Sequence, residues 1–369
     1  DAKRWSEPFL VGVKQPMAHW CIATDRVRYV GEPVAIVAAE SRYIAEDAVA
    51  LIEVEYRILP AVVEVTVAMT PDAPVLHPEV GSNLVNARKF NYGDPQAVFA
   101  EASHVVRASL RYPRNSCTPM ECFALVAEYL AAEQSYDVLA NFQGPYALHP
   151  VMARALKVAG SRLRLRTPAD SGGSFGVKQA IFPYIVAMSL AARKAARPVK
   201  WVEDRLEHLL AASSATGRIS NIAAAVASDG KIEALELEQI EDCGAYLRAP
   251  EPASLYRMHG VLTGAYDIPH LAVTNRIVLT NRTPSGLNRG FGGPQVYFAL
   301  ERLMQRIAVE LSLDPLEVIR RNLVPAANFP FRAAAGAILD SGDYEACVGQ
   351  AVDEGGLAEL RTRRDEALA

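Results

Sequence analysis

Short segments of alternating apolar and polar residues recur along this chain, and longer segments with helical periodicity separate them. The alternation predicts strands over residues 104–112, 124–129, 163–166, 199–202, 219–226, 232–240 and 274–279. Helical periodicity predicts helices over residues 145–158, 178–196 and 294–311, and Asp314 followed by Pro315 predicts a capped helix that ends at Asn322. Asp229-Gly230 predicts a hairpin between two of the strands. The mixture indicates an α/β or α+β protein.

The first part of the chain has its own pattern. Residues 28–30 and 34–37 predict two strands around the turn Gly31-Glu32-Pro33, and Ser41 predicts the start of a helix. Residues 52–56 alternate apolar and acidic side chains, which predicts a half-exposed strand. Residues 70–92 are rich in Pro, Gly and Asn, so we expect an irregular connection there.

Composition narrows the class of protein. A length of 369 residues favours two or more domains, and the net charge of −4 argues against nucleic-acid binding. No apolar run reaches the roughly 18 residues that a membrane span needs. The five cysteines are scattered and odd in number, without a C-x-x-C pair, and no H-E-x-x-H is present. This usage fits a reducing cytoplasm and makes zinc or iron–sulfur ligation within this chain unexpected.

Two glycine-rich loops are the most informative motifs. One is Gly172-Gly173-Ser174-Phe175-Gly176-Val177-Lys178, and the other is Arg289-Gly290-Phe291-Gly292-Gly293-Pro294-Gln295. Backbone without Cβ atoms can approach a ligand closely, and a loop between a strand and a helix aims N–H groups at an anion. A tight turn is the ordinary alternative for each loop. Neither loop fits G-x-x-x-x-G-K-[ST] or G-x-G-x-x-G, so we expect one large anionic cofactor held from two sides.

In combination, the loops resemble those of the molybdenum-cofactor subunit in the xanthine dehydrogenase and aldehyde oxidase family. Residues 28–60 resemble the family's a/b hammerhead domain, and residues from about 83 to 321 resemble its first molybdopterin-binding domain. We therefore expect a partial hammerhead domain at 1–68 whose earlier strands would precede Asp1. A linker at 69–95, the molybdopterin-binding domain at 96–345 and a helical segment at 346–369 would follow. That segment would lead to a second domain.

The resemblance implies roles for individual residues. Gln143 matches the glutamine that hydrogen-bonds an oxygen ligand of molybdenum. The cofactor-binding backbone would be that of Gly172, Gly173, Ser174, Phe175 and Gly176 on one side and of Arg289, Gly290, Phe291 and Gly292 on the other. Phe291 matches a ring that stacks on an aromatic substrate. Core packing is the alternative for Phe291, and a surface amide is the alternative for Gln143.

Two further residues and one loop bear on substrate preference. Gln179 stands where purine-specific members carry a glutamate, and an arginine without that glutamate argues against a purine. Arg257 matches their substrate arginine, with an ordinary surface arginine as the equal alternative. Residues 283–287 contain no cysteine where carbon monoxide dehydrogenases carry a copper ligand.

Cys122 follows Pro119-Met120-Glu121 in a family-like segment, and we interpret it as a buried thiol.

The resemblance also implies chemistry that this chain does not complete. Family members oxidise an aldehyde or an N-heteroaromatic C–H with oxygen from water, and a glutamate in a G-x-G-E turn takes the proton. We find no such turn after Gln295, so the base would lie on a second molybdopterin-binding domain or subunit. The cofactor would be molybdopterin, as the cytosine dinucleotide, and a [2Fe–2S] subunit and an FAD subunit would remove the electrons.

Two other functions remain open from the sequence. A non-catalytic binding or assembly module could use the same fold, because no base is found; molybdenum content would distinguish it from an enzyme subunit. An unrelated nucleotide-binding enzyme would instead be stabilised by ATP or NAD.

Overall fold

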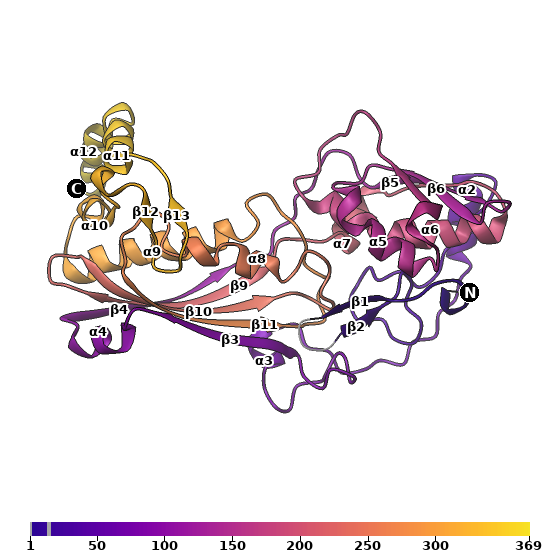
Figure 1. The fold of residues 1–369 in the computed structure, drawn as a ribbon, viewed down its shortest axis with the longest axis horizontal. Helices are drawn as coiled ribbons and strands as arrows, with labels where there is room; N and C mark the ends of the chain where they lie inside the picture. Colours follow the sequence, from indigo (N-terminus) through magenta and orange to yellow (C-terminus); the bar gives the residue numbers. More distant parts are fainter. Residues whose placement is uncertain (1, 13–15) are drawn as a thin grey trace.

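The computed structural model describes residues 2–12 and 16–369. Two sheets at opposite ends of an elongated molecule carry most of the chain, and the amino-terminal segment packs beside the smaller sheet (Figure 1). The mixed α/β class predicted from the sequence is confirmed. Among the described residues, no helix is both long and apolar enough to cross a lipid bilayer.

The larger sheet has five strands in the order β3-β11-β10-β9-β4. Its strands are β3 (Leu84–Tyr92), β4 (His104–Tyr112), β9 (Gly217–Val226), β10 (Ile232–Asp242) and β11 (His270–Val278). The predicted hairpin is confirmed, because β9 and β10 pair antiparallel, whereas β10 and β11 pair parallel. Helix α9 (Gly293–Leu311) lies along one face of this sheet and buries an apolar stripe that includes Leu300, Leu303 and Ile307.

The smaller sheet has four strands in the order β7-β6-β5-β8. Its strands are β5 (Ala124–Leu130), β6 (Ser135–Ala140), β7 (Leu163–Arg166) and β8 (Val199–Val202). Helices α5 (Pro145–Ala155) and α6 (Phe182–Ala195) pack against it around Phe123, Met152 and Ile185, which are fully buried. The predicted helix over 178–196 begins instead with a 3₁₀ turn, Val177–Ile181, and the α-helix starts at Phe182. Pro183 lies in its first turn, where the missing N–H costs no intrahelical hydrogen bond.

Shorter elements connect and flank the two sheets. They are α1 (Ala2–Trp5), β1 (Phe9–Gly12), β2 (Pro16–His19), α2 (Arg42–Ala50), α3 (Val65–Ala68), α4 (Pro95–Glu101), α7 (Arg205–Ala211), α8 (Ala253–Arg257), α10 (Pro315–Asn322), β12 (Phe331–Arg332), β13 (Ile338–Leu339), α11 (Tyr344–Glu354) and α12 (Leu357–Leu368). Both predicted caps are confirmed, since Ser41 caps α2 and Asp314 caps α10, where Pro315 occupies the first turn. The helical character expected for 346–369 is also confirmed.

The strands predicted over 28–30, 34–37 and 52–56 do not form in the described chain. A strand needs a partner that accepts and donates along its backbone, and the backbone bonds found between residues 20 and 37 are isolated ones such as Ala23 N to Pro33 O, at 2.8 Å. Ile58 and Val30 are 93 % and 74 % exposed. The alternating pattern was present, but nothing in the described residues pairs with it.

The connection predicted over 70–92 is wrong for residues 84–92. These residues form β3, which pairs antiparallel with β11 at the edge of the larger sheet. An edge strand is covered on fewer sides, so its apolar residues need not alternate strictly, and only Val85 and Asn86 of β3 are buried. The proposed domain boundaries at 68, 95 and 345 remain predictions.

The amino-terminal segment is joined to the larger sheet through a buried polar cluster. Tyr246 donates its hydroxyl to Glu32 Oε1 at 2.8 Å and accepts from Arg28 Nη1 at 3.0 Å. Arg248 Nη2 donates to the Tyr29 hydroxyl at 2.7 Å. Because each of these bonds crosses more than 200 residues of sequence, the cluster fixes the segment on the chain that leads to the candidate site.

Candidate cofactor site between two glycine loops

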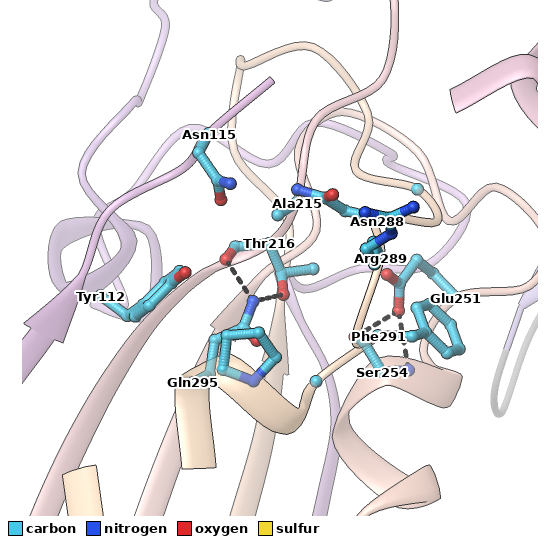
Figure 2. A pocket seen from close by; sticks show the side chains of 13 residues that line it. Tyr112, Asn115, Ala215, Thr216, Glu251, Ser254, Asn288, Arg289, Phe291 and Gln295 are labelled. Atoms are coloured by element: carbon cyan, nitrogen blue, oxygen red, sulfur yellow. Dashed lines mark hydrogen bonds between the residues drawn. The ribbon is translucent and has the colours of Figure 1, made fainter. Parts of the chain in front are cut away.

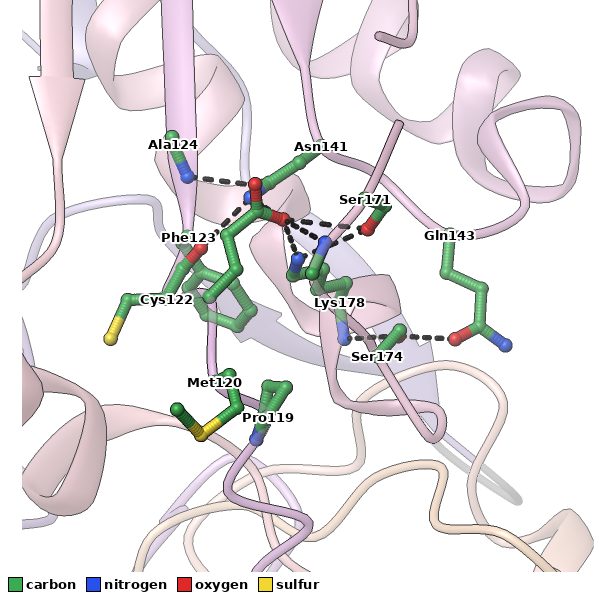
Figure 3. A network of polar contacts seen from close by, with 12 residues as sticks. Pro119, Met120, Cys122, Phe123, Ala124, Asn141, Gln143, Ser171, Ser174 and Lys178 are labelled. Atoms are coloured by element: carbon green, nitrogen blue, oxygen red, sulfur yellow. Dashed lines mark hydrogen bonds and ion pairs between the residues drawn. The ribbon is translucent and has the colours of Figure 1, made fainter. Parts of the chain in front are cut away.

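The first glycine loop follows β7, and the carboxylate of Glu121 anchors it. Glu121 Oε2 accepts from Asn141 Nδ2 at 3.0 Å and from the Gly172 amide at 3.2 Å, and it forms an ion pair with Lys178 (Figure 3). An added Cβ at Gly172 would lie 2.5 Å from the Glu121 Cβ. A glycine is therefore required there by close approach to Glu121.

The two partners of this ion pair differ in their exposure to solvent. The Lys178 side chain is 1 % exposed, whereas that of Glu121 is 39 % exposed. The hydrogen bond from Lys178 holds the pKa of the Glu121 carboxyl below its ordinary value, against the opposing effect of burial. A buried ammonium needs such a partner, so the ion pair fixes the start of the helix that follows the loop.

The side chain of Gln143 also hydrogen-bonds the first glycine loop. Its Oε1 accepts from the Gly176 amide at 3.0 Å and from the Ser174 hydroxyl. A backbone N–H can only donate, so the orientation of the Gln143 amide is fixed and its Nε2 remains as the outward group. The side chain is exposed, and Nε2 has no hydrogen-bond partner within the described part of the chain. Gln143 thus presents a donor at the mouth of the loop.

The second glycine loop lies at the start of α9, with Gly292 as the N-cap at φ +91°. An added Cβ at Gly292 would collide with the Ser254 carbonyl oxygen, so this loop packs directly on α8. Phe291 is only 7 % exposed, and the Arg257 guanidinium lies 5.9 Å from its ring centroid. A small cavity adjoins the loop; Tyr112, Asn115, Thr216, Glu251, Phe291 and Gln295 are among its lining residues (Figure 2).

The two loops meet in space, as the sequence predicts. The Arg289 amide donates to the Phe175 carbonyl at 2.8 Å, and the Arg289 guanidinium lies 4.9 Å from the centroid of the Phe175 ring. The thiol of Cys117 lies between them, 3.2 Å from Asn288 Oδ1 and 3.5 Å from the Phe175 carbonyl oxygen. Burial raises the pKa of the Cys117 thiol, so it acts here as a neutral donor.

Both loop aromatics have left-handed backbone, with φ +55° at Phe175 and +37° at Phe291. For a bulky side chain this conformation costs about 1–2 kcal/mol each, and such strain concentrates at ligand-binding segments. The sequence placed one ring among glycines in each loop. The structure adds that both loops bend at the ring itself.

The two substrate residues proposed from the sequence lie on different loops. Gln179 is half-buried in the 3₁₀ turn after the first loop, close to Gly144, and its Oε1 is buried without a hydrogen bond. Arg257 is exposed at the end of α8 and stacks on Phe291. Within the described chain, no hydrogen bond, ion pair or ring contact joins Gln179 to Arg257.

Several residues of the site were not found by sequence reasoning. Glu121, Asn141, Lys178 and Cys117 position the loops, and Glu251 lines the cavity. Glu121 stood in the segment that drew attention to Cys122, yet a single acidic residue before a strand carries no signal of its own. Lys178 was noted only as a departure from a phosphate-binding loop. A buried role for a lysine is visible only when its partner, 57 residues away, is placed beside it.

Cys122 itself is half-buried rather than fully buried. Its Sγ shares a space with side-chain atoms of Glu203 and His208, all within 4.8 Å of one another. Glu203 Oε2 already accepts from the Phe123 amide at 3.0 Å and contacts His208 Nδ1 at 2.7 Å. These bonds explain the buried carboxylate without any ion.

Comparison with known proteins agrees with this geometry. Residues 76–323 match the molybdopterin cofactor-binding domain family, and residues 6–60 match the a/b hammerhead domain of aldehyde oxidase and xanthine dehydrogenase. The chain therefore belongs to the molybdopterin-binding family of the xanthine dehydrogenase and aldehyde oxidase type. The predicted family resemblance is confirmed.

Individual relatives share this architecture. The chain is 33 % identical over 353 residues to the 6-hydroxypseudooxynicotine dehydrogenase complex subunit gamma of Paenarthrobacter nicotinovorans, covering 94 % of this chain and 44 % of that protein. It is 31 % identical over 348 residues to the carbon monoxide dehydrogenase large chain of Hydrogenophaga pseudoflava, covering 90 % of this chain and 43 % of that one. The quinoline 2-oxidoreductase structure from Pseudomonas putida 86 superposes with a TM-score of 0.92 at 32 % identity, covering all of this chain and 48 % of that one. The chain thus spans less than half the length of these proteins.

The residues present fit a molybdopterin cofactor. The glycines leave bare backbone on two facing loops, Gln143 presents an amide donor, and the exposed Arg289 supplies a fixed cation. An anionic cofactor needs donors and positive charge of this kind. The thiol of Cys117 is engaged in holding the loops together.

Proposed function

We propose that this chain is the molybdenum-cofactor-binding part of a hydroxylase or dehydrogenase that oxidises an aldehyde or an N-heteroaromatic C–H, with water as the oxygen source. The observation that carries the proposal is the direct junction of the two glycine loops through Arg289 N–H and the Phe175 carbonyl, at 2.8 Å. That bond brings the outward Gln143 amide, the bare backbone of 172–176 and the Arg289 side chain to one place.

Each group would have a separate task. Gln143 Nε2 would donate to an oxygen ligand of the metal, and the backbone of Gly173, Ser174 and Gly176 would support the pterin. Arg289, together with the backbone of Gly290 and Gly292, would hold the cofactor from the opposite side. The bound cofactor supplies the redox centre; the chain supplies orientation and charge complementarity.

Substrate selection would fall to the surroundings of Phe291. Arg257 stacks on this ring. By the family resemblance, Gln179 would take the position of the purine-binding glutamate. A neutral amide does not accept as strongly as a carboxylate from a purine N–H. We therefore favour an aldehyde or a simple N-heterocycle over a purine, with Phe291 as the stacking ring.

The catalytic base and the electron acceptors would come from elsewhere. None of the carboxylates in the described chain lies in a G-x-G-E turn, so we propose a second molybdopterin-binding domain, on this protein or on a partner subunit, as the source of a glutamate base. A [2Fe–2S] subunit and an FAD subunit would carry the electrons away. The cytosine dinucleotide form of the pterin and a cytoplasmic location, which suits five free cysteines, complete the proposal.

Metal and pterin content tests the binding role directly. The protein is co-produced with its partner subunits, and molybdenum is measured by mass spectrometry alongside released pterin. Arg289→Ala should lose at least about tenfold in both, because one charge-assisted contact to an anion contributes roughly 1.5–3 kcal/mol. Arg302→Ala is the matched control and should keep full content, because Arg302 is exposed on α9 and, among the described residues, its side chain hydrogen-bonds only Gln305.

Two outcomes would overturn the proposal. Equal cofactor content in Arg289→Ala and the unchanged protein would remove the second loop from the site. Negligible molybdenum in the unchanged protein, after co-production with partners, would favour a binding or assembly module instead.

A further inference from the structure

A buried pair of carboxyl groups lies behind the second glycine loop and is linked by one hydroxyl. Ser254 Oγ lies 2.6 Å from Glu251 Oε2 (Figure 2). The same oxygen lies 2.6 Å from Glu241 Oε1. Glu241 and Glu251 are 0 % and 4 % exposed. Both distances are those of strong O–H···O hydrogen bonds. Each bond needs a proton, and the Ser254 hydroxyl supplies only one.

The second proton must come from one of the two carboxyl groups. Glu241 forms a bidentate ion pair with Arg218, whose Nε lies 2.5 Å from Oε2 and whose Nη2 lies 3.0 Å from Oε1. That pairing stabilises the ionised form of Glu241. The proton therefore belongs on Glu251 Oε2, which donates to Ser254 Oγ, and Ser254 in turn donates to Glu241.

The other oxygen of Glu251 supports this assignment. Glu251 Oε1 is buried and has no hydrogen-bond partner within the described residues. The Ser254 amide donates to the other oxygen, Oε2, at 3.3 Å, so an ionised Glu251 would still leave charge on a buried Oε1 that has no donor among the described residues. A neutral carbonyl oxygen at Oε1 costs far less than a charged one. Burial, and next the charge of Glu241, raise the pKa of Glu251 from 4.5 to about 8.

Other charged and titratable groups face Glu251 without pairing with it. Arg114 precedes the loops in sequence, and its Nη1 donates to the Thr283 carbonyl at 2.7 Å. Cys243 follows β10, and burial, followed by the charge of Glu251, raises the pKa of its thiol well above the ordinary value. Tyr112 and Arg289 line the same cavity. Among the described residues, no ion pair reaches Glu251.

This chain of groups touches the second loop directly. The Ser254 carbonyl is the atom that an added Cβ at Gly292 would strike, and Arg218 Nη2 donates to that same carbonyl at 3.4 Å. The backbone of Ser254 is thus held by the ion pair on one side and covered by the glycine loop on the other. A change in charge at Glu251 acts on the surface that supports Arg289 and Phe291.

We propose that Glu251 is a positioning residue of the second glycine loop and that it works in its protonated form, as the neutral end of a Glu251–Ser254–Glu241–Arg218 hydrogen-bond chain. The functional importance of Glu251 rests on the proposed cofactor role of that loop. The hydrogen-bond chain of these four side chains does not depend on that role. The ionised form would place two carboxylates on one hydroxyl and weaken the packing of α8 against Gly292.

The sign of the pH dependence follows from linkage. A carboxyl whose folded pKa is raised contributes stability that is fully present below its unfolded pKa, about 4.5, and is lost as pH rises toward its folded pKa, about 8. If the loop opens to give Glu251 its ordinary pKa, opening increases by up to about tenfold per pH unit across this window. The loop should therefore be best ordered near pH 5.

The test compares the protein with Glu251→Gln, whose amide is isosteric with the neutral acid and cannot ionise. Infrared spectra at pH 7 should show a carboxylic-acid C=O band that Glu251→Gln lacks. Hydrogen exchange of the amides in 289–293 should accelerate between pH 5.5 and 8 in the unchanged protein relative to Glu251→Gln at the same pH. Glu236→Gln, an exposed carboxylate on β10, is the control and should behave like the unchanged protein.

Glu251→Leu separates this role from simple filling of space, because it should expose the loop at every pH while Glu251→Gln preserves it. Absence of the acid band, or equal pH dependence in the unchanged protein and Glu251→Gln, would overturn the proposal. Neither readout requires bound cofactor. Failure here therefore differs from failure of the proposed function, which would appear in the metal content of Arg289→Ala.

Discussion

Two glycines, one in the site and one outside it, show what a single residue contributes. Gly292 and Gly336 have φ values of +91° and +99°, so an L side chain is strained at both. They differ in surroundings, since a Cβ at Gly336 meets nothing within 4 Å, whereas at Gly292 it meets the Ser254 carbonyl. The pair separates backbone strain from steric exclusion.

We expect Gly336→Ala to lower the free energy of unfolding by about 1 kcal/mol, from the left-handed backbone alone. Gly292→Ala should cost about 2–4 kcal/mol, because overpacking against backbone adds to the same strain. Thermal unfolding of both variants measures the difference. Equal destabilisation would mean that the loop moves away from α8 without penalty, contrary to the close packing described above.

At the residue scale, the sequence predicted which glycines the loops need, but it did not predict the side chains that hold those loops in place. Gly172, Gly176 and Gly292 stand in motifs, and their need for bare backbone can be argued from the motif. Glu121, Lys178 and Ser254 have no motif, because their roles depend on atoms brought together by the fold. Phe291 was expected to face a ligand, and its 7 % exposure shows that most of the ring is packed.

At the scale of elements, the first loop and the helix after it depend on one ion pair. Glu121→Gln would leave the buried Lys178 ammonium without its counter-charge. Removing one partner of a buried pair costs about 3–5 kcal/mol, and the partial exposure of Glu121 places the expected loss near the lower end, about 3 kcal/mol. Adding Lys178→Met should restore much of the loss, since no charge is then left unpaired.

The acid dependence of the same variant provides a second measurement. The pKa of Glu121 is lowered, so its contribution is present above about pH 4.5 and is lost as pH falls through the lower folded value. The unchanged protein should therefore lose stability below pH 4.5 more steeply than the double variant. A double variant as unstable as Glu121→Gln alone would contradict this account.

Element types were predictable where periodicity was supported by local partners. The β9–β10 hairpin and the caps of α2 and α10 are determined within a few residues, and all three formed as expected. β3 was missed because its partner β11 lies some 180 residues further along the chain. Residues 28–37 have strand-like patterning that finds no partner in the described chain, so pattern alone gave the wrong answer.

For the whole molecule, the attachment of the amino-terminal segment is the feature most open to test. Tyr246→Phe removes the hydroxyl that joins Glu32 and Arg28 and leaves Glu32 Oε1 without this donor, at a cost of about 1–3 kcal/mol, while Oε2 keeps the Arg28 amide at 2.5 Å. Limited proteolysis should then cut within residues 20–60 faster, while amides in β9 and β10 stay protected from exchange.

Tyr266→Phe supplies the control for this change. The Tyr266 hydroxyl also donates to a carboxylate, that of Glu301, at 2.8 Å, but Tyr266 packs in the core of the larger sheet. It should leave cleavage in 20–60 unchanged. Faster cleavage in both variants would indicate general loosening rather than release of one segment.

The pairing of β3 with β11 also has a consequence for biosynthesis. Residues 84–92 emerge from the ribosome long before residues 270–278, yet they find their hydrogen-bonding edge only on that later strand. Closure over so long an interval is slow compared with a local hairpin. The nascent chain must therefore carry the unpaired backbone edge of β3 until β11 has been made, which is the interval in which a chaperone would protect it.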